Sequence, residues 1–162
     1  MAWLKRWWPA LAWAAIISVL STGSFTSDNT AHFIVPFLHW LLPRASHQTI
    51  EFLHHLIRKC AHFTEYFILS LLIFRGIRSG EKGWHLRWAL TTVLIVAGYA
   101  ALDEFHQSFV PGRQAAVGDV LIDASGGIAA QLVASLVVLF GGVRQQRRDE
   151  EDAAKRKTSS TS

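Results

Sequence analysis

The hydrophobic residues of this chain gather in four long runs separated by polar segments. The runs cover about residues 7–25, 60–74, 86–102 and 117–140. A helix needs about 20 apolar residues to cross a hydrocarbon core of about 30 Å. The alternation of polar and apolar positions typical of membrane β-strands is absent. The pattern therefore predicts an all-α, polytopic membrane bundle with four transmembrane helices.

The segment between the first two runs, residues 26–59, has apolar residues at helical spacing in AHFIVPFLHWLL and SHQTIEFLHHLIRK. We expect two amphipathic helices in the outer membrane interface, with Trp40 at headgroup depth. Pro36 is expected to bend the first helix, and Pro43 to separate the two. Ser46 is a suitable N-cap for the second, which we expect to continue into the second span.

The first run could also be a cleaved signal peptide, because Lys5 and Arg6 precede it. However, the run is long and ends in STGSFTSD without a clear small-x-small cleavage site. This pattern favours an uncleaved first span.

The distribution of basic residues predicts the orientation. If the N-terminus is cytoplasmic, the cytoplasmic segments hold 12 of the 16 Lys and Arg residues, and only Arg44, Arg58, Lys59 and Arg113 lie outside. Positive charge marks the inner side, so we expect both termini in the cytoplasm. The net charge of +4 is explained by this topology, and nucleic acid is not expected as a partner.

A chain of 162 residues predicts one domain, which we assign to residues 1–143. The remaining RQQRRDEEDAAKRKTSSTS, residues 144–162, is expected to be a disordered cytoplasmic tail. The single cysteine, Cys60, excludes an intramolecular disulfide and a multi-cysteine metal site.

This topology brings three helix ends to the outer face: the start of the second span, the end of the third and the start of the fourth. Residues at helical spacing place polar side chains on one face of each helix. The resulting candidate cluster contains Lys59, His62, Tyr66, Asp103, Glu104, Gln107, Asp119 and Asp123. A stripe of small residues that allows close helix packing follows on the fourth span: Gly126, Ala130 and Ala134.

The sequence Val110-Pro111-Gly112-Arg113 is typical of a tight turn. Such a turn would direct Arg113 back toward the carboxylates, where it and Lys59 are the available counter-charges. Ionisable residues within a membrane indicate a functional site by default. An ion-pair network that only joins three helices is an equally good interpretation of this pattern.

Three motifs resemble the VanZ-like family of small bacterial integral membrane proteins. They occur in order between Lys59 and Gln131, as KCAHFTEY, DEFHQSFVPGR and GDVLIDASGG. One position departs from the family pattern, since residue 123 is Asp where Asn is common. The family positions matched here are Lys59, His62, Phe63, Tyr66, Asp103, Glu104, Gln107, Phe109, Pro111, Arg113, Asp119, Val120, Asp123 and Gly126.

The resemblance implies a multi-pass protein of the bacterial cytoplasmic (inner) membrane. The family is named after a member associated with resistance to the glycopeptide antibiotic teicoplanin, so a role in glycopeptide resistance is the functional expectation. The resemblance supplies no reaction, and we expect no cofactor.

Residue chemistry leaves several functions open. The first is binding of a cell-envelope ligand, such as a lipid-linked wall precursor or a glycopeptide antibiotic. The second is an intramembrane enzyme in which His62 and Glu104 act as acid and base on a lipid pyrophosphate. A metal site at His62 with Glu65, or at His106 with Asp103, is a third, but no HExxH motif is present. A transporter is a fourth, but the inner halves of the spans are apolar. The absence of a nucleophile motif favours binding over catalysis, and no bound metal is predicted.

Overall fold

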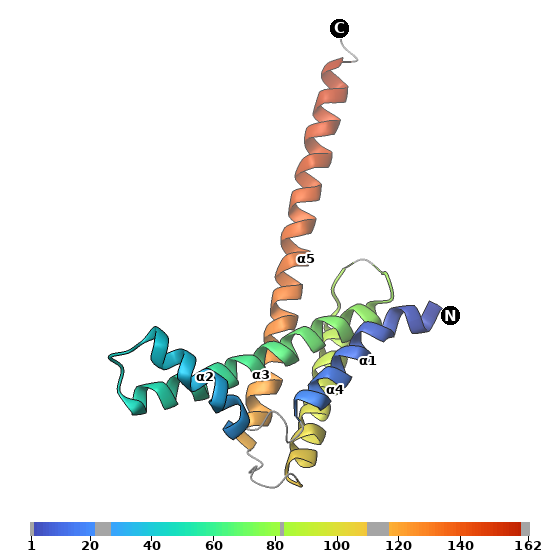
Figure 1. Ribbon diagram of the computed structural model, residues 1–162. Coiled ribbons are helices and arrows are strands. Elements are labelled where there is room, and N and C mark those ends of the chain that lie inside the picture. The colour runs from blue at the N-terminus through green and yellow to red at the C-terminus, as the bar shows by residue number, and fades with distance from the viewer. Residues whose placement is uncertain (1, 22–26, 82, 110–116, 160–162) are drawn as a thin grey trace.

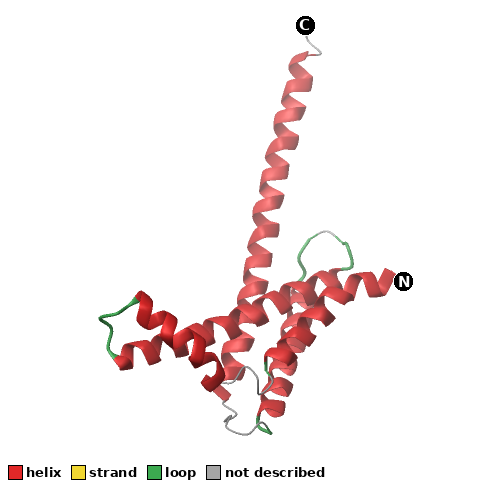
Figure 2. Ribbon diagram, viewed as in Figure 1, coloured by secondary structure: helices red, strands yellow, loops and turns green. Residues whose placement is uncertain are grey.

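The computed structural model describes residues 2–21, 27–81, 83–109 and 117–159. Every regular element within these ranges is a helix, which confirms the predicted all-α class (Figure 2). The helices are α1 (Ala2–Leu20), α2 (Ser27–Leu41), α3 (His47–Arg78), α4 (Leu86–Gln107) and α5 (Val117–Ser159).

The long helix α3 is the centre of the fold and contacts all four other helices (Figure 1). It begins after Pro43, where Ser46 is the N-cap and its side chain accepts a hydrogen bond of 3.2 Å from the backbone N–H of Thr49. It ends at Arg78, and the following C-cap residue, Ser79, has a left-handed φ of 59°. The residues predicted as the second amphipathic helix and those predicted as the second span therefore form one continuous helix.

Three of the described helices are long and apolar enough to cross a membrane: α3, α4 and the Val117–Gly141 part of α5. Helix α1 is not among them. Its 19 residues include four tryptophans, Lys5, Arg6 and Pro9, which lower its hydropathy. The chain thus has the helices of a membrane protein, while the fourth span and the orientation of the termini stay predictions. Phe25, the predicted end of the first span, lies outside the described residues.

The buried core is small and lies between α1, α3 and α4. It contains Ala10, Ile17, Tyr66, Leu69, Ile73, Val96 and Ala100. Large apolar side chains cover the outside instead, as at Leu94, Leu121 and Phe140, which are 72%, 65% and 66% exposed. An apolar exterior of this extent is expected where helices face lipid rather than water.

Helices α3 and α5 approach closely because α5 presents small residues to α3. A Cβ atom added at Gly126 would collide with the backbone carbonyl oxygen of Phe63. One residue on, a Cβ at Gly127 would lie 2.8 Å from a Val96 side-chain carbon on α4. Ala130, one turn further, is fully buried, and Ala134 is half-buried. The glycines therefore set the distance from α5 to both neighbours.

Helix α5 continues to Ser159 and extends away from the other helices (Figure 1). Residues 144–159, which we predicted to be a disordered tail, are therefore the last part of this helix in the structure. The segment RRDEEDAAKRK is rich in good helix formers, and Glu151 and Asp152 precede Lys155 and Arg156 by four residues. These local preferences favour a helix. The helix of 43 residues is about 65 Å long.

Candidate functional site

The centre of the candidate site is the buried carboxyl group of Asp103 on α4. Its Oδ2 atom accepts hydrogen bonds from three helices: from Ser21 Oγ at the end of α1 at 2.6 Å, from Gln107 Nε2 on α4 at 2.7 Å, and from Tyr66 Oη on α3 at 3.4 Å. Asp103 is 7% exposed and Tyr66 is fully buried. Burial of a carboxyl group requires such donors, and here they join the C-terminal ends of α1 and α4 to α3.

A second carboxyl group, that of Asp123 on α5, lies beside α3 about one helical turn from Tyr66. The Nδ1 atom of His62 is 3.4 Å from Oδ1 of Asp123 on α5, and the Asp123 side chain is almost completely buried. His62 and Tyr66 are four residues apart and therefore share one face of α3. We call Ser21, His62, Tyr66, Asp103, Gln107 and Asp123 the polar cluster.

Three further hydrogen bonds fix α1 in the position that brings Ser21 to Asp103. The Trp13 indole Nε1–H donates to the Glu65 carbonyl oxygen at 2.9 Å. The Tyr99 hydroxyl donates to the Ala14 carbonyl oxygen at 2.7 Å and lies 2.7 Å from Ser18 Oγ. Because the Tyr99 proton is used on Ala14, the Ser18 hydroxyl is the donor in the second contact. Helix α1 is thus held by polar groups of α3 and α4 along its second half.

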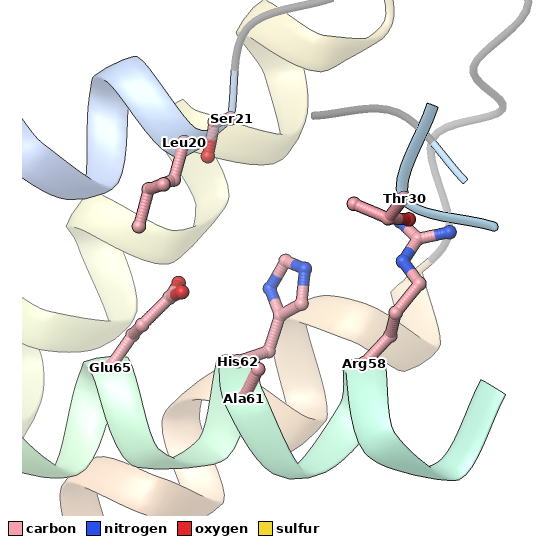
Figure 3. A pocket seen from close by; sticks show the side chains of 7 residues that line it. All are labelled: Leu20, Ser21, Thr30, Arg58, Ala61, His62 and Glu65. Atoms are coloured by element: carbon pink, nitrogen blue, oxygen red, sulfur yellow. The ribbon is translucent and has the colours of Figure 1, made fainter. Parts of the chain in front are cut away.

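A pocket of about 120 Å³ opens beside the polar cluster. Figure 3 shows its polar side chains: Arg58 extends toward Thr30 of α2, while His62 and Glu65 point from α3 into the space below the end of α1. The lining residues are Leu20, Ser21, Thr30, Arg58, Ala61, His62 and Glu65. The polar cluster and the pocket share Ser21 and His62, so a group bound in the pocket would touch the cluster directly.

The other residues predicted for the site lie in different places. Lys59 is exposed on α3, and its neighbour Arg58 lines the pocket instead. Glu104 is buried at 7% exposure beside Asp103 in sequence, and Asp119 is half-buried at the start of α5. Arg113 and the predicted turn at 110–113 lie outside the described residues. Among those that are described, no three His, Cys, Asp or Glu side chains form a group that could hold a metal ion.

Sequence analysis missed two polar contributions. Ser21 was treated as part of a generic first span, although Ser18 and Ser21 are three residues apart at its outer end and could have indicated a polar face. The second is a deeper pair, in which Gln131 Nε2 donates to Ser70 Oγ at 2.8 Å and Ser70 Oγ donates to the Gly127 carbonyl oxygen at 2.9 Å. This pair joins α3 to α5 within the apolar part of both helices.

The arrangement presents a guanidinium group, an imidazole, a carboxylate and two hydroxyl groups around a small space. These groups complement a small polar head that carries both an anionic oxygen and a hydrogen-bond donor. The two buried carboxyl groups behind the pocket fix His62, Tyr66 and Ser21 in position.

Comparison with known proteins gives one match. A family model described as VanZ/LLP1 matches residues 6–139, a range that includes every residue of the polar cluster and of the pocket. No curated protein and no solved structure matches the chain.

Proposed function

The chain belongs to the VanZ/LLP1 family, and we propose that it spans the bacterial cytoplasmic membrane four times and binds a cell-envelope ligand at its outer face. The observation that carries this proposal is the pocket beside the polar cluster, which is lined by Arg58, His62 and Glu65. Ionisable side chains within membrane-spanning helices cost free energy, and by default they indicate a ligand or ion site.

The lining residues support a ligand that carries a phosphate or carboxylate group. An arginine guanidinium binds either group by two parallel charge-assisted hydrogen bonds. Glu65, Thr30 and Ser21 complement amide, hydroxyl or ammonium groups of the same ligand. Pockets for whole drug-sized molecules measure about 300–1,000 Å³. A pocket of about 120 Å³ therefore accommodates one polar end of a lipid-linked wall precursor or of a glycopeptide antibiotic. Reduced susceptibility to teicoplanin-type glycopeptides would be its cellular consequence.

The contacts of α1 support the fourth span. At 19 residues α1 is about 28 Å long, close to the hydrocarbon thickness of about 30 Å. Its polar side chains Trp13 and Ser18, and Ser21 directly after its last residue, all have partners on α3 or α4. Hydrogen bonds between helices stabilise such a marginally apolar helix within a bilayer.

Thiol labelling of intact cells tests the four-span topology. In a Cys60→Ser background, His47→Cys is expected to react with a membrane-impermeant reagent, whereas Trp3→Cys and Glu81→Cys react only after permeabilisation. Residue 3 is decisive, because α1 must cross the membrane to separate it from residue 47. Labelling of residue 3 from outside would contradict the fourth span.

Antibiotic susceptibility tests the ligand site. Arg58→Gln is expected to abolish the glycopeptide resistance that the wild type restores to a deletion strain, because loss of a charge-assisted hydrogen bond of about 1.5–3 kcal/mol weakens binding at least about tenfold. Lys59→Gln is the matched control, since it removes the same charge from the exposed neighbouring residue and should behave as wild type. The measurement is the minimal inhibitory concentration across glycopeptides and lipoglycopeptides.

Three outcomes count against the proposal. Equal susceptibility of the wild-type and deletion strains would contradict a role in glycopeptide resistance. Equal effects of Arg58→Gln and Lys59→Gln would contradict the pocket. A parallel loss of resistance and of membrane-inserted protein, measured by immunoblot, would instead support a purely structural role for the network of charged and polar groups.

A further inference from the structure

Four basic side chains converge at the opposite end of the bundle from the polar cluster. Lys5 and Arg6 of α1 and Arg75 and Arg78 of α3 line a second pocket of about 610 Å³, together with Ser79 and Gly80. The two helices meet here because the Trp7 ring packs on Gly76: a Cβ at Gly76 would lie 3.0 Å from the nearest ring carbons. We call the four cations and their cavity the basic pocket.

The energetics of the two helices do not explain this convergence. Arg75 and Arg78 lie in the last turn of α3, where cations interact favourably with the helix dipole. Lys5 and Arg6 lie near the N-terminal end of α1, where the dipole disfavours cations. Within the described part of the chain, none of the four forms an ion pair with an acidic side chain. The mutual repulsion of four cations therefore favours an anion from outside the protein.

The depth of the basic pocket indicates where that anion comes from. A rise of about 1.5 Å per residue separates His62 from Arg75 by about 20 Å, and Arg6 from Ser21 by about 23 Å. These distances approach the thickness of the hydrocarbon core, so the polar cluster and the basic pocket lie near opposite membrane surfaces. Tryptophans prefer the headgroup region. Five of the seven in the chain lie near the pocket end of α1 or the start of α4: Trp3, Trp7, Trp8, Trp84 and Trp88.

We propose that the basic pocket binds the headgroup phosphates of an anionic phospholipid. Basic pockets between membrane helices on the cytoplasmic side suit such headgroups. Two cations from each of two helices match a headgroup with two phosphates better than one with a single phosphate. The lipid would join α1 to α3 at the end of α1 that carries Lys5 and Arg6. It would complement the polar contacts of Trp13, Ser18 and Ser21 at the other end.

Native mass spectrometry of the full-length protein in detergent tests the proposal with defined lipids. The wild type is expected to retain cardiolipin more strongly than phosphatidylglycerol, and both more strongly than phosphatidylcholine. Arg75→Gln combined with Arg78→Gln is expected to weaken cardiolipin binding about 25-fold, at about fivefold for each cation removed near the membrane surface. Arg87→Gln is the matched control, because this exposed arginine at the start of α4 lies at the same end but does not line the pocket.

A double variant of α1 and a competing soluble anion, inorganic phosphate, complete the test. Lys5→Gln combined with Arg6→Gln removes the other half of the pocket and gives the same expected loss if the α3 variant fails to fold. Equal cardiolipin binding by the wild type and both double variants, or equal retention of cardiolipin and phosphatidylcholine by the wild type, would overturn the proposal. So would inorganic phosphate that binds as tightly as the lipid, since the site would then hold a soluble anion. None of these variants alters the Arg58 pocket, so this proposal and the proposed function fail independently.

Discussion

Replacing Gly126 with alanine is expected to lower the free energy of unfolding by about 3 kcal/mol, the upper end of the range for overpacking a well-packed interface. The added Cβ would collide with the backbone carbonyl oxygen of Phe63, which belongs to α3 and cannot rotate away as a side chain would. Helix α5 must therefore move outward. This movement would also separate His62 from Asp123 and Ser70 from Gly127.

The effect of Gly126→Ala is measured by unfolding the detergent-solubilised protein with increasing mole fractions of dodecyl sulfate. Gly98→Ala is the matched control, because a Cβ at this exposed position of α4 meets no atom within 4 Å. The control is expected to be neutral or to stabilise the protein by up to about 1 kcal/mol through helix propensity. Equal stability of the two variants would mean that α3 and α5 do not approach as closely as described.

Replacing Asp103 with leucine is expected to destabilise the protein by about 3 kcal/mol or more. The change removes the common acceptor of Ser21, Tyr66 and Gln107 and leaves three buried donors without it. Each buried polar group left unpaired costs about 1–3 kcal/mol. The C-terminal end of α1 is also released from α4. In the same unfolding measurement, Asp103→Asn should lower the free energy of unfolding by less, about 1–2 kcal/mol, because the amide keeps one acceptor oxygen but not the charge.

Asp119→Asn is the matched control for Asp103→Asn. Asp119 is half-buried in the first turn of α5, where a carboxylate contributes about 0.3–1 kcal/mol through the helix dipole. Equal losses for the two asparagine variants would show that the hydrogen bonds to Asp103 do not hold α1 and α4 together.

Much of the architecture could be predicted from local sequence features. The apolar runs at 60–74, 86–102 and 117–140 lie within α3, α4 and α5, and Pro43 with Ser46 marked the start of α3. The tail was predicted to be disordered because of its high density of charge, while its residues also favour the helix in which the structure places residues 144–159. For α1, length and average composition suggested an independent span, but the helix contains four tryptophans and two basic residues and is not among the described helices that are apolar enough to cross a membrane.

The sequence predicted which residues of the candidate site share one face of a helix. It did not predict which side chains of different helices meet. The spacing of Asp103 and Gln107 put them on one face, and the topology brought His62 and Asp123 to one depth. The rotation of each helix about its axis was not predictable, and adjacent residues differ by about 100° in direction. For this reason the helical spacing suited Arg58 as well as Lys59, and the structure places Arg58 at the pocket. Ser21 had no identifiable partner until α1 was placed against α4.

The contacts of α1 have a consequence for how the protein is made. The partners of its polar side chains are added by the ribosome much later, since Glu65 follows Trp13 by 52 residues and Asp103 follows Ser21 by 82. When α1 leaves the ribosome, neither Tyr99 nor Asp103 has been synthesised. We therefore expect α1 to wait at the insertion machinery and to take its final position only after α4 has been translated. A nascent chain that stops before Tyr99 should still have a loosely held N-terminal helix.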